Sequence, residues 1–303
     1  MKSRASFDHG RIPVGPGRPL EIEEASNRYL IHPLSRALVD RLILTSATPN
    51  QVSISSVFAA GAAALCYLAL PWPWGPFSGF ACQIIWHVLD GADGDLARRS
   101  GRASDLGELI DGVCDHLSQL LINLAFIAIL ARGLGPWAWG IGLAAGLAHF
   151  VQSNAYETGR KTYCRWMSGT RWMRQAQPGA NGVRGALGGL YMAVSNAFSP
   201  GEAGIEEAMA PFAEAVGPDM DRARRLYRES MAPLVKQSGL LSGNTRTLAS
   251  ALSMLVGGPL WYFLFEIVVL NIVMAWVLAR RQKINRRLAV MLRASAPASR
   301  PAP

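Results

Sequence analysis

The stretch that most constrains this chain is Asp90–Asp115, because it places four carboxylates among long apolar segments. Asp90 and Asp93 are three positions apart, and Asp111 and Asp115 are four apart, so on helices each pair shares one face. An ionised side chain in the middle of a membrane costs about 2.5–3.5 kcal/mol on insertion scales. These four side chains, called the aspartate cluster below, therefore predict a site that binds something cationic.

The residues between the two pairs predict a helical hairpin. Ser100 and Gly101 end the first helix, and either Ser104 or Asp105 caps the second, with Glu108 in the capping-box position after Asp105. Two helices that turn back on each other bring the pairs together. Carboxylate oxygens are hard ligands, which favours Mg²⁺ or Mn²⁺, two ions in all, over zinc.

Three further residues of this stretch suit a phosphate ligand. Gly94 and Gly107 lack side chains where a ligand would press against the backbone. Arg98 lies one helical turn beyond Gly94 and offers a planar fork of donors for phosphate oxygens. Two divalent ions would carry four positive charges against the four carboxylates and leave the site about neutral until a diphosphate binds.

With these residues the chain resembles the signature of the CDP-alcohol phosphotransferase (CDP-alcohol phosphatidyltransferase) family. The matching positions are Asp90, Asp93, Gly94, Ala97, Arg98, Gly107, Asp111 and Asp115. The run Thr48-Pro49-Asn50-Gln51-Val52 is also similar to that family's entry into its first membrane helix. The resemblance implies transfer of a substituted phosphoryl group from a CDP-alcohol, such as CDP-diacylglycerol, to an acceptor hydroxyl in phospholipid biosynthesis, with release of CMP.

The resemblance also implies a role for each residue of the aspartate cluster. Asp90 and Asp111 would be shared by both metal ions, Asp93 would complete one ion and Asp115 the other. Asp115 would also be the general base that takes the proton of the acceptor hydroxyl. The residues expected to hold the nucleotide are Gly94, Arg98, Ser104, Gly107 and Asn50. A homodimer is expected on the same ground.

Basic residues later in the chain are candidates for the acceptor side. These are Arg160, Lys161, Arg165 and Arg246. The first three lie in a run with interleaved aromatic residues, which is equally typical of a membrane-interface belt at the end of a helix.

Half of the 303 residues are hydrophobic and only 17% are charged, which favours an integral membrane protein over a soluble enzyme. We predict an all-α, polytopic fold with six spans, most of roughly the 17–25 residues that a bilayer needs. The predicted spans are 51–71, 77–97, 107–131, 136–156, 243–257 and 259–279. The last two are separated only by Gly257-Gly258-Pro259, which is either a tight turn or a kink in one long span.

The lysine and arginine residues predict the orientation in the membrane. Of the 30, only Arg132 falls in the predicted loops of the far side, so the positive-inside rule places the other loops and the aspartate cluster at the cytosolic face of the inner membrane. The formal charge of +9 then reflects topology and anionic membrane lipids, and no nucleic-acid partner is predicted.

The predicted organisation has five parts. Residues 1–47 are a tail and an amphipathic helix over 26–44, with Leu30, Leu34, Leu38 and Leu42 on one face, which lies either on the membrane surface or against the protein itself. Residues 48–160 are the catalytic core, 161–242 a cytoplasmic insertion, 243–281 the last two spans and 282–303 a basic tail. Within the insertion, 181–198 predicts a re-entrant or interfacial helix and 219–231 a charged amphipathic helix.

Three alternative functions remain. The amphipathic segment and the motif version DGADGDLARR are somewhat similar to the branch of the family that joins inositol phosphates with soluble headgroups. A membrane prenyltransferase would need a second acidic motif on a distant helix, and none lies downstream. A divalent-cation transporter would use the carboxylates but would have no need for Gly94, Arg98 or Gly107.

Overall fold

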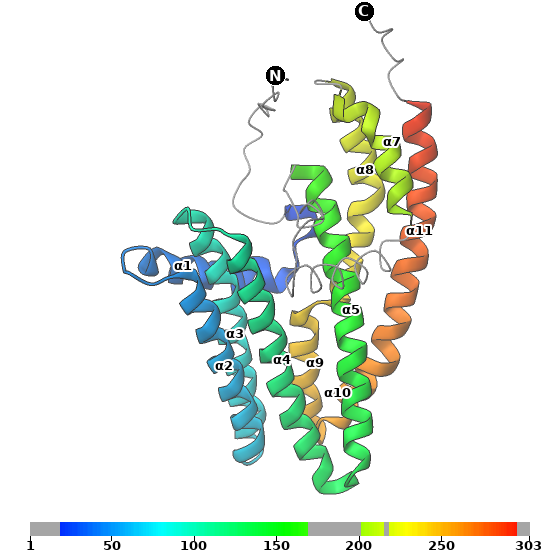
Figure 1. Ribbon diagram of the computed structural model, residues 1–303. Coiled ribbons are helices and arrows are strands. Elements are labelled where there is room, and N and C mark those ends of the chain that lie inside the picture. Colours follow the sequence, from blue (N-terminus) through cyan, green and yellow to red (C-terminus); the bar gives the residue numbers. More distant parts are fainter. Residues whose placement is uncertain (1–18, 169–200, 215–217, 296–303) are drawn as a thin grey trace, which may run out of the picture.

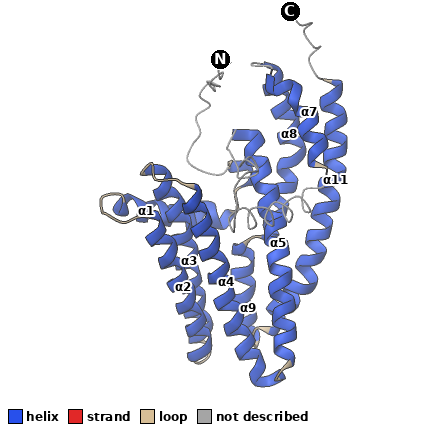
Figure 2. Cartoon of the chain, in the orientation of Figure 1, coloured by secondary structure: helices blue, strands red, loops and turns tan. Residues whose placement is uncertain are grey.

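The computed structural model describes residues 19–168, 201–214 and 218–295, and within them every regular element is a helix (Figure 2). The predicted all-α fold class is thereby confirmed. The longer elements are α1 (His32–Leu42), α2 (Pro49–Ala69), α3 (Trp74–Arg99), α4 (Asp105–Leu134), α5 (Trp137–Ser168), α7 (Glu202–Glu214), α8 (Pro218–Gln237), α9 (Gly243–Val256), α10 (Leu260–Leu264) and α11 (Asn271–Ala294). Shorter 3₁₀ and π elements are η1 (Leu20–Ile22), η2 (Asn27–Ile31), η4 (Ser238–Leu241) and η5 (Phe265–Leu270).

The helices form a bundle with two levels (Figure 1). At the lower level α2, α3, α4, α5 and α9 run side by side, and the α2–α3, α4–α5 and α9–α10 connections lie at the lower end. At the upper level α7 and α8 pack against the upper parts of α5 and α11. The α3–α4 connection, which carries the hairpin of the aspartate cluster, lies at the upper end of the lower level.

Three helical segments of the described part are long and apolar enough to cross a membrane. They are Pro49–Ala69, Leu106–Leu134 and Leu260–Ala294. The predicted spans at 77–97, 136–156 and 243–257 correspond to α3, α5 and α9. Of these, α9 has 14 residues, fewer than a bilayer needs, and α3 carries the charges of the site. The count of six spans stays a prediction.

The two readings of Gly257-Gly258-Pro259 are resolved by the structure. Gly257 and Gly258 have φ angles of +150° and +117°, which side-chain-bearing residues rarely adopt. The Ser253 hydroxyl donates to the Gly258 carbonyl at 2.6 Å and accepts from the Tyr262 amide at 2.9 Å. The segment is therefore a tight turn between two packed helices, α9 and α10.

The predicted amphipathic segment is helical and lies across α2 and α3 (Figure 1). Only half of the leucine stripe belongs to its contact face: Leu30 and Leu34 are 44% and 46% exposed, whereas Leu38 and Leu42 pack, with the buried Val39, against a small core that includes Ala92 of α3. Ser35 approaches α3 because Gly91 has no side chain there, and its hydroxyl donates to the Val88 carbonyl at 2.8 Å. The segment therefore packs on the protein along α1, and Leu30 and Leu34 at its start remain exposed.

The upper level has its own hydrophobic core, built around Tyr163, Phe212, Tyr227 and Leu288. The predicted helix at 219–231 lies within α8, whereas the predicted helix at 181–198 lies outside the described residues. Helix α11 continues to Ala294 and contacts α7 and α8, so the predicted basic tail from residue 282 begins inside a packed helix.

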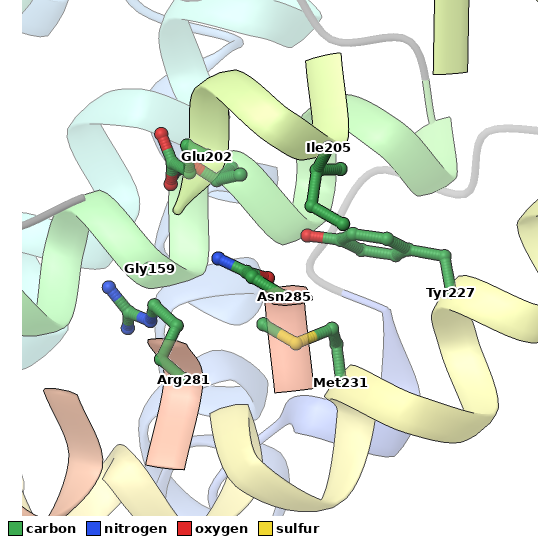
Figure 3. Close-up of a pocket in the computed structure, with 8 residues that line it drawn as sticks. Gly159, Glu202, Ile205, Tyr227, Met231, Arg281 and Asn285 are labelled. Carbon is green, nitrogen blue, oxygen red and sulfur yellow. Dashed lines mark hydrogen bonds between the residues drawn. The ribbon is translucent and has the colours of Figure 1, made fainter. Parts of the chain in front are cut away.

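The buried Arg281 side chain joins this upper core to α5. Figure 3 shows it beside a pocket that residues of α5, α7, α8 and α11 line. A Cβ on Gly159 would lie 1.7 Å from Arg281 Nη2, so only glycine admits the guanidinium at this point of α5. Nearby, the Thr162 hydroxyl donates to Glu202 at 2.8 Å, which attaches α5 to the start of α7.

Candidate active site

The aspartate cluster is assembled by α3 and α4, which are joined as the sequence predicts. Helix α3 ends at Arg99, and Gly101 follows with a φ angle of +68°. Ser104 is the residue that caps α4, because its hydroxyl accepts from the Gly107 amide at 3.1 Å. Across this hairpin the carboxyl of Asp111 interacts directly with that of Asp93, and the carboxyl of Asp115 with that of Asp90.

Asp93 is the most firmly held member of the cluster. It is 3% exposed, and its carboxylate accepts from the Ser53 hydroxyl of α2 and, at 2.5 Å, from the Gly94 amide. Ser53 was not among the predicted site residues. The available signal was a polar side chain inside an apolar span, one helical turn after Asn50.

The donor set of the cluster fits a hard cation. Within the three described ranges no group of three or more His, Cys, Asp and Glu side chains is arranged as a ready metal site, and the carboxyls meet as two pairs instead. Two carboxyl groups in direct contact need a proton or a cation between them, because like charges repel. Four carboxylates offer oxygen ligands only, which is the preference of Mg²⁺ and Mn²⁺.

The predicted nucleotide residues gather where the N-termini of α2 and α4 meet. Thr48 caps α2, and Asn50 lies in its first turn. A Cβ on Gly107 would lie 3.2 Å from the Ser104 hydroxyl and 3.7 Å from Asn50 Oδ1, so Asn50, Ser104 and Gly107 are neighbours. Helix N-termini present unpaired amides and a partial positive charge, which suits phosphate.

Arg98 covers the remaining predicted nucleotide residue, Gly94. A Cβ on Gly94 would lie 3.2 Å from Arg98 Nη1. The Arg98 side chain is 56% exposed, and its ion pair with Asp95 is long, at 3.7 Å. The guanidinium is therefore positioned at the rim of the site.

Of the predicted acceptor residues, the structure brings Lys161 of α5 to the cluster. Lys161 acts electrostatically on Asp111, and its amine lies 3.4 Å from Glu108 of α4. Arg165 is directed to the upper level instead, where it pairs with Glu206 at 2.7 Å.

Arg160 is held by Glu157 on the same helix. Its Nε and Nη2 atoms lie 3.1 Å and 2.5 Å from the two carboxylate oxygens. Burial alone would lower the pKa of the Arg160 guanidinium, but the Glu157 carboxylate outweighs burial and the pKa is raised. Glu157 also acts on Asp111 and Asp115, so this carboxylate, absent from the predicted site, faces the cluster from α5.

Arg246 lies inside the bundle and is 3% exposed. It forms an ion pair with Glu266 at 3.0 Å and donates to Gln152 at 2.7 Å. Glu266 also accepts from the Tyr262 hydroxyl at 2.7 Å and lies 3.2 Å from His149 Nδ1. These five side chains, Arg246, Glu266, His149, Gln152 and Tyr262, are called the ionic network below.

Arg246 was predicted to bind the acceptor, and the structure shows that it also connects helices through the ionic network. Its guanidinium connects α9 to α5 and η5, and on α5 it also donates to the Ser153 hydroxyl at 2.9 Å. Glu266 is a polar residue within an apolar segment, and that signal predicts function or mutual hydrogen bonding. The spacing along the chain could not have paired it with Arg246, which is on another helix.

The fold and site together define a class of protein: an all-helical membrane protein with a carboxylate site shared by two adjoining helices. Residues 46–170 of the chain match the family model of CDP-alcohol phosphatidyltransferases. This segment contains α2, α3 and α4 with the whole aspartate cluster, so the match supports the predicted family.

Three relatives are similar to this chain over the same part. A Bifunctional IPC transferase and DIPP synthase of Thermococcus kodakarensis is 30% identical over 129 residues, which cover 42% of this chain and 28% of that protein. Cholinephosphotransferase 1 of Xenopus laevis is 32% identical over 123 residues, 37% of this chain and 30% of that protein. A CDP-diacylglycerol--serine O-phosphatidyltransferase of Encephalitozoon cuniculi is 25% identical over 115 residues, 36% and 30% respectively. The matched segment thus spans less than a third of each relative.

Proposed function

We propose that this protein transfers a substituted phosphoryl group from a CDP-alcohol, such as CDP-diacylglycerol, to an acceptor hydroxyl and releases CMP, in phospholipid biosynthesis. The observation that carries the proposal is the meeting of the two acidic pairs across the α3–α4 hairpin. The Asn50, Ser104 and Gly107 group beside it supports binding of the cytidine diphosphate, with Arg98 over Gly94 at the rim.

The residues of the chain divide the reaction between them. Asp115 takes the proton of the acceptor hydroxyl, and the resulting oxygen attacks the β-phosphorus of the donor. The bond from the β-phosphorus to the bridging oxygen breaks, and that oxygen leaves with CMP. Two Mg²⁺ or Mn²⁺ ions, held by the aspartate cluster, would neutralise negative charge on the diphosphate. The Ser53 hydroxyl and the Gly94 amide hold Asp93 in place.

The location and assembly are part of the same proposal. The upper end of the lower level faces the cytosol in an inner membrane, since nearly all lysine and arginine residues are on that side in the predicted topology. CDP-activated alcohols are formed from CTP, which is cytosolic. The enzyme works as a homodimer, as the family resemblance implies.

A second activity is favoured by one comparison. The Thermococcus relative carries DIPP synthase in its name, in line with the inositol-phosphate-joining branch that the motif version resembles. In that case both the donor headgroup and the acceptor would be soluble.

The test is a substrate matrix with purified, full-length protein. CDP-diacylglycerol, CDP-choline and CDP-inositol are each combined with hydroxyl acceptors in Mg²⁺ or Mn²⁺, and CMP release and product mass are recorded. We expect CMP only with a matching pair and only with the metal present. Chelation with EDTA should stop CMP release, and added Mg²⁺ should restore it. Diphosphate release from a prenyl donor, or cation flux without CMP, would show that a rival function is correct.

A further inference from the structure

The α5 side of the aspartate cluster carries a polar stripe. Ser153, Glu157 and Lys161 are four residues apart, so they share one face of α5. Glu157 and Lys161 look toward α4, because Lys161 reaches Glu108 and Glu157 acts on Asp111 and Asp115, whereas the Ser153 hydroxyl accepts from Arg246 of α9. Glu157 and Lys161 therefore lie beside the cluster on its α5 side.

Glu157 is the part of this stripe that meets both solvent and the cluster. Its side chain is 37% exposed, whereas Arg160 behind it is 18% exposed. The two contacts to Arg160 fix the plane of the carboxylate, since a guanidinium fork accepts one orientation of its partner. A carboxylate held in one orientation beside the cluster favours molecules that can donate a hydrogen bond to it.

Because the predicted nucleotide residues lie elsewhere, the α5 side of the aspartate cluster is left for the acceptor. Asn50, Ser104 and Gly107 lie at the N-termini of α2 and α4, while Asp115 lies further along α4. An acceptor hydroxyl that reaches Asp115 from the other side passes Glu157. A carboxylate only accepts hydrogen bonds and repels other acceptors, so ester and ether oxygens have no favourable contact there.

We propose that Glu157, oriented by Arg160, selects the acceptor: a polar alcohol with a second hydrogen-bond donor, either another hydroxyl or an ammonium group, in preference to a diacylglycerol. This inference rests on the proposed function, because it assigns the acceptor class of the same site. Lys161, one turn further on, accommodates an anionic group of such an acceptor. Diacylglycerol has one hydroxyl, which reacts, and its other oxygens are esters.

The test compares Glu157→Gln with a matched control in the full-length protein. Glu206→Gln is the control, because Glu206 also pairs with an arginine of α5, Arg165, but at the upper level. Acceptors are glycerol phosphate, inositol phosphate, serine and a short-chain diacylglycerol, each with its fitting CDP-alcohol. We expect turnover with a polar acceptor, and Glu157→Gln should raise KM for it by about tenfold, as loss of a hydrogen bond to a charged group does. KM for the donor should stay unchanged, and Glu206→Gln should change neither.

A binding measurement separates this inference from the proposed function. Calorimetry of the same acceptors with the Mg²⁺-loaded protein needs no turnover. Binding of a polar acceptor that weakens in Glu157→Gln supports the assignment even if no CMP is released, in which case the proposed function fails alone. Preference for diacylglycerol, or equal acceptor KM and affinity in the two variants, would overturn it.

Discussion

The molecule contains two groups of buried charges, and they are built in opposite ways. The aspartate cluster brings together four groups of the same sign, supported by one serine hydroxyl and one backbone amide. The ionic network pairs Arg246 with Glu266 and surrounds them with His149, Gln152 and Tyr262. Both lie among apolar helices, where uncompensated charge is costly.

The difference separates structural charge from functional charge. Opposite charges in the ionic network compensate each other at 3.0 Å, although Glu266 Oε2 is buried without a hydrogen-bond partner. Like charges in the aspartate cluster destabilise one another until a cation or proton joins them. Glu266 also lies in the π-helical element η5. The balanced group stabilises the bundle, and the unbalanced one is the candidate for chemistry.

The largest effect that follows is on turnover. Asp115→Asn should lower kcat by about 10²–10⁴-fold, because the proposed general base is removed, while CDP-alcohol binding largely persists. An assay of CMP release measures kcat, and a separate binding assay measures the affinity for the CDP-alcohol. Glu207→Gln is the control, since Glu207 lies on α7 at the upper level and pairs with Arg293 at 2.7 Å. Equal loss of binding and turnover in a folded Asp115→Asn protein would mean that Asp115 is a ligand more than a base.

The second effect is on stability. Arg246→Met leaves Glu266 buried without its partner, and breaking a buried pair in this way costs about 3–5 kcal/mol. Thermal unfolding in detergent should therefore show a lower Tm. The double variant Arg246→Met with Glu266→Gln should recover much of the loss, because no buried charge is left alone. If the double variant is less stable than the single one, the network does not work as a balanced pair.

A smaller effect is expected where the aspartate cluster is anchored. Ser53→Ala removes the hydroxyl that donates to Asp93 and should weaken metal affinity by about 10–100-fold, as loss of a group that orients a metal ligand does. The Mg²⁺ dependence of CMP release and direct Mn²⁺ titration both measure this. Ser55→Ala on the exposed side of α2 serves as the control. Unchanged metal affinity in Ser53→Ala would show that Asp93 needs no such support.

The smallest effect is at the rim. Arg98→Ala should raise KM for the donor by about tenfold with little change in kcat, because a charge-assisted contact to phosphate is lost. Arg99→Ala removes the neighbouring guanidinium, which pairs with Asp40 at 2.7 Å, and should leave the donor KM unchanged. An unaltered donor KM in Arg98→Ala would remove Arg98 from the nucleotide site.

Local spacing predicted a good part of the site. The offsets within each acidic pair, the break at Gly101 and a cap at either Ser104 or Asp105 all follow from helix geometry, which depends on neighbours in the chain. The structure agrees with the first two and selects Ser104 as the cap. The Gly257–Pro259 segment was left open by the same reasoning, because a turn and a kink use the same residue types and only the packing of α9 against α10 distinguishes them.

Contacts between distant segments were beyond reach from spacing. Ser53 on Asp93, Glu157 beside Asp115 and Glu266 on Arg246 each join residues from different helices. The contact face of the amphipathic segment likewise extends beyond its leucines to Ser35, because Gly91 admits that side chain.

By itself, the amino-acid sequence determined the helical class, the resemblance of the signature to a known family and the acidic hairpin, because these depend on composition and on short separations along the chain. The tertiary structure decided which charges are balanced and which face each other without compensation. That distinction depends on which helices pack together, and packing is set by side-chain shape across segments far apart in the chain, as at Gly159 against Arg281.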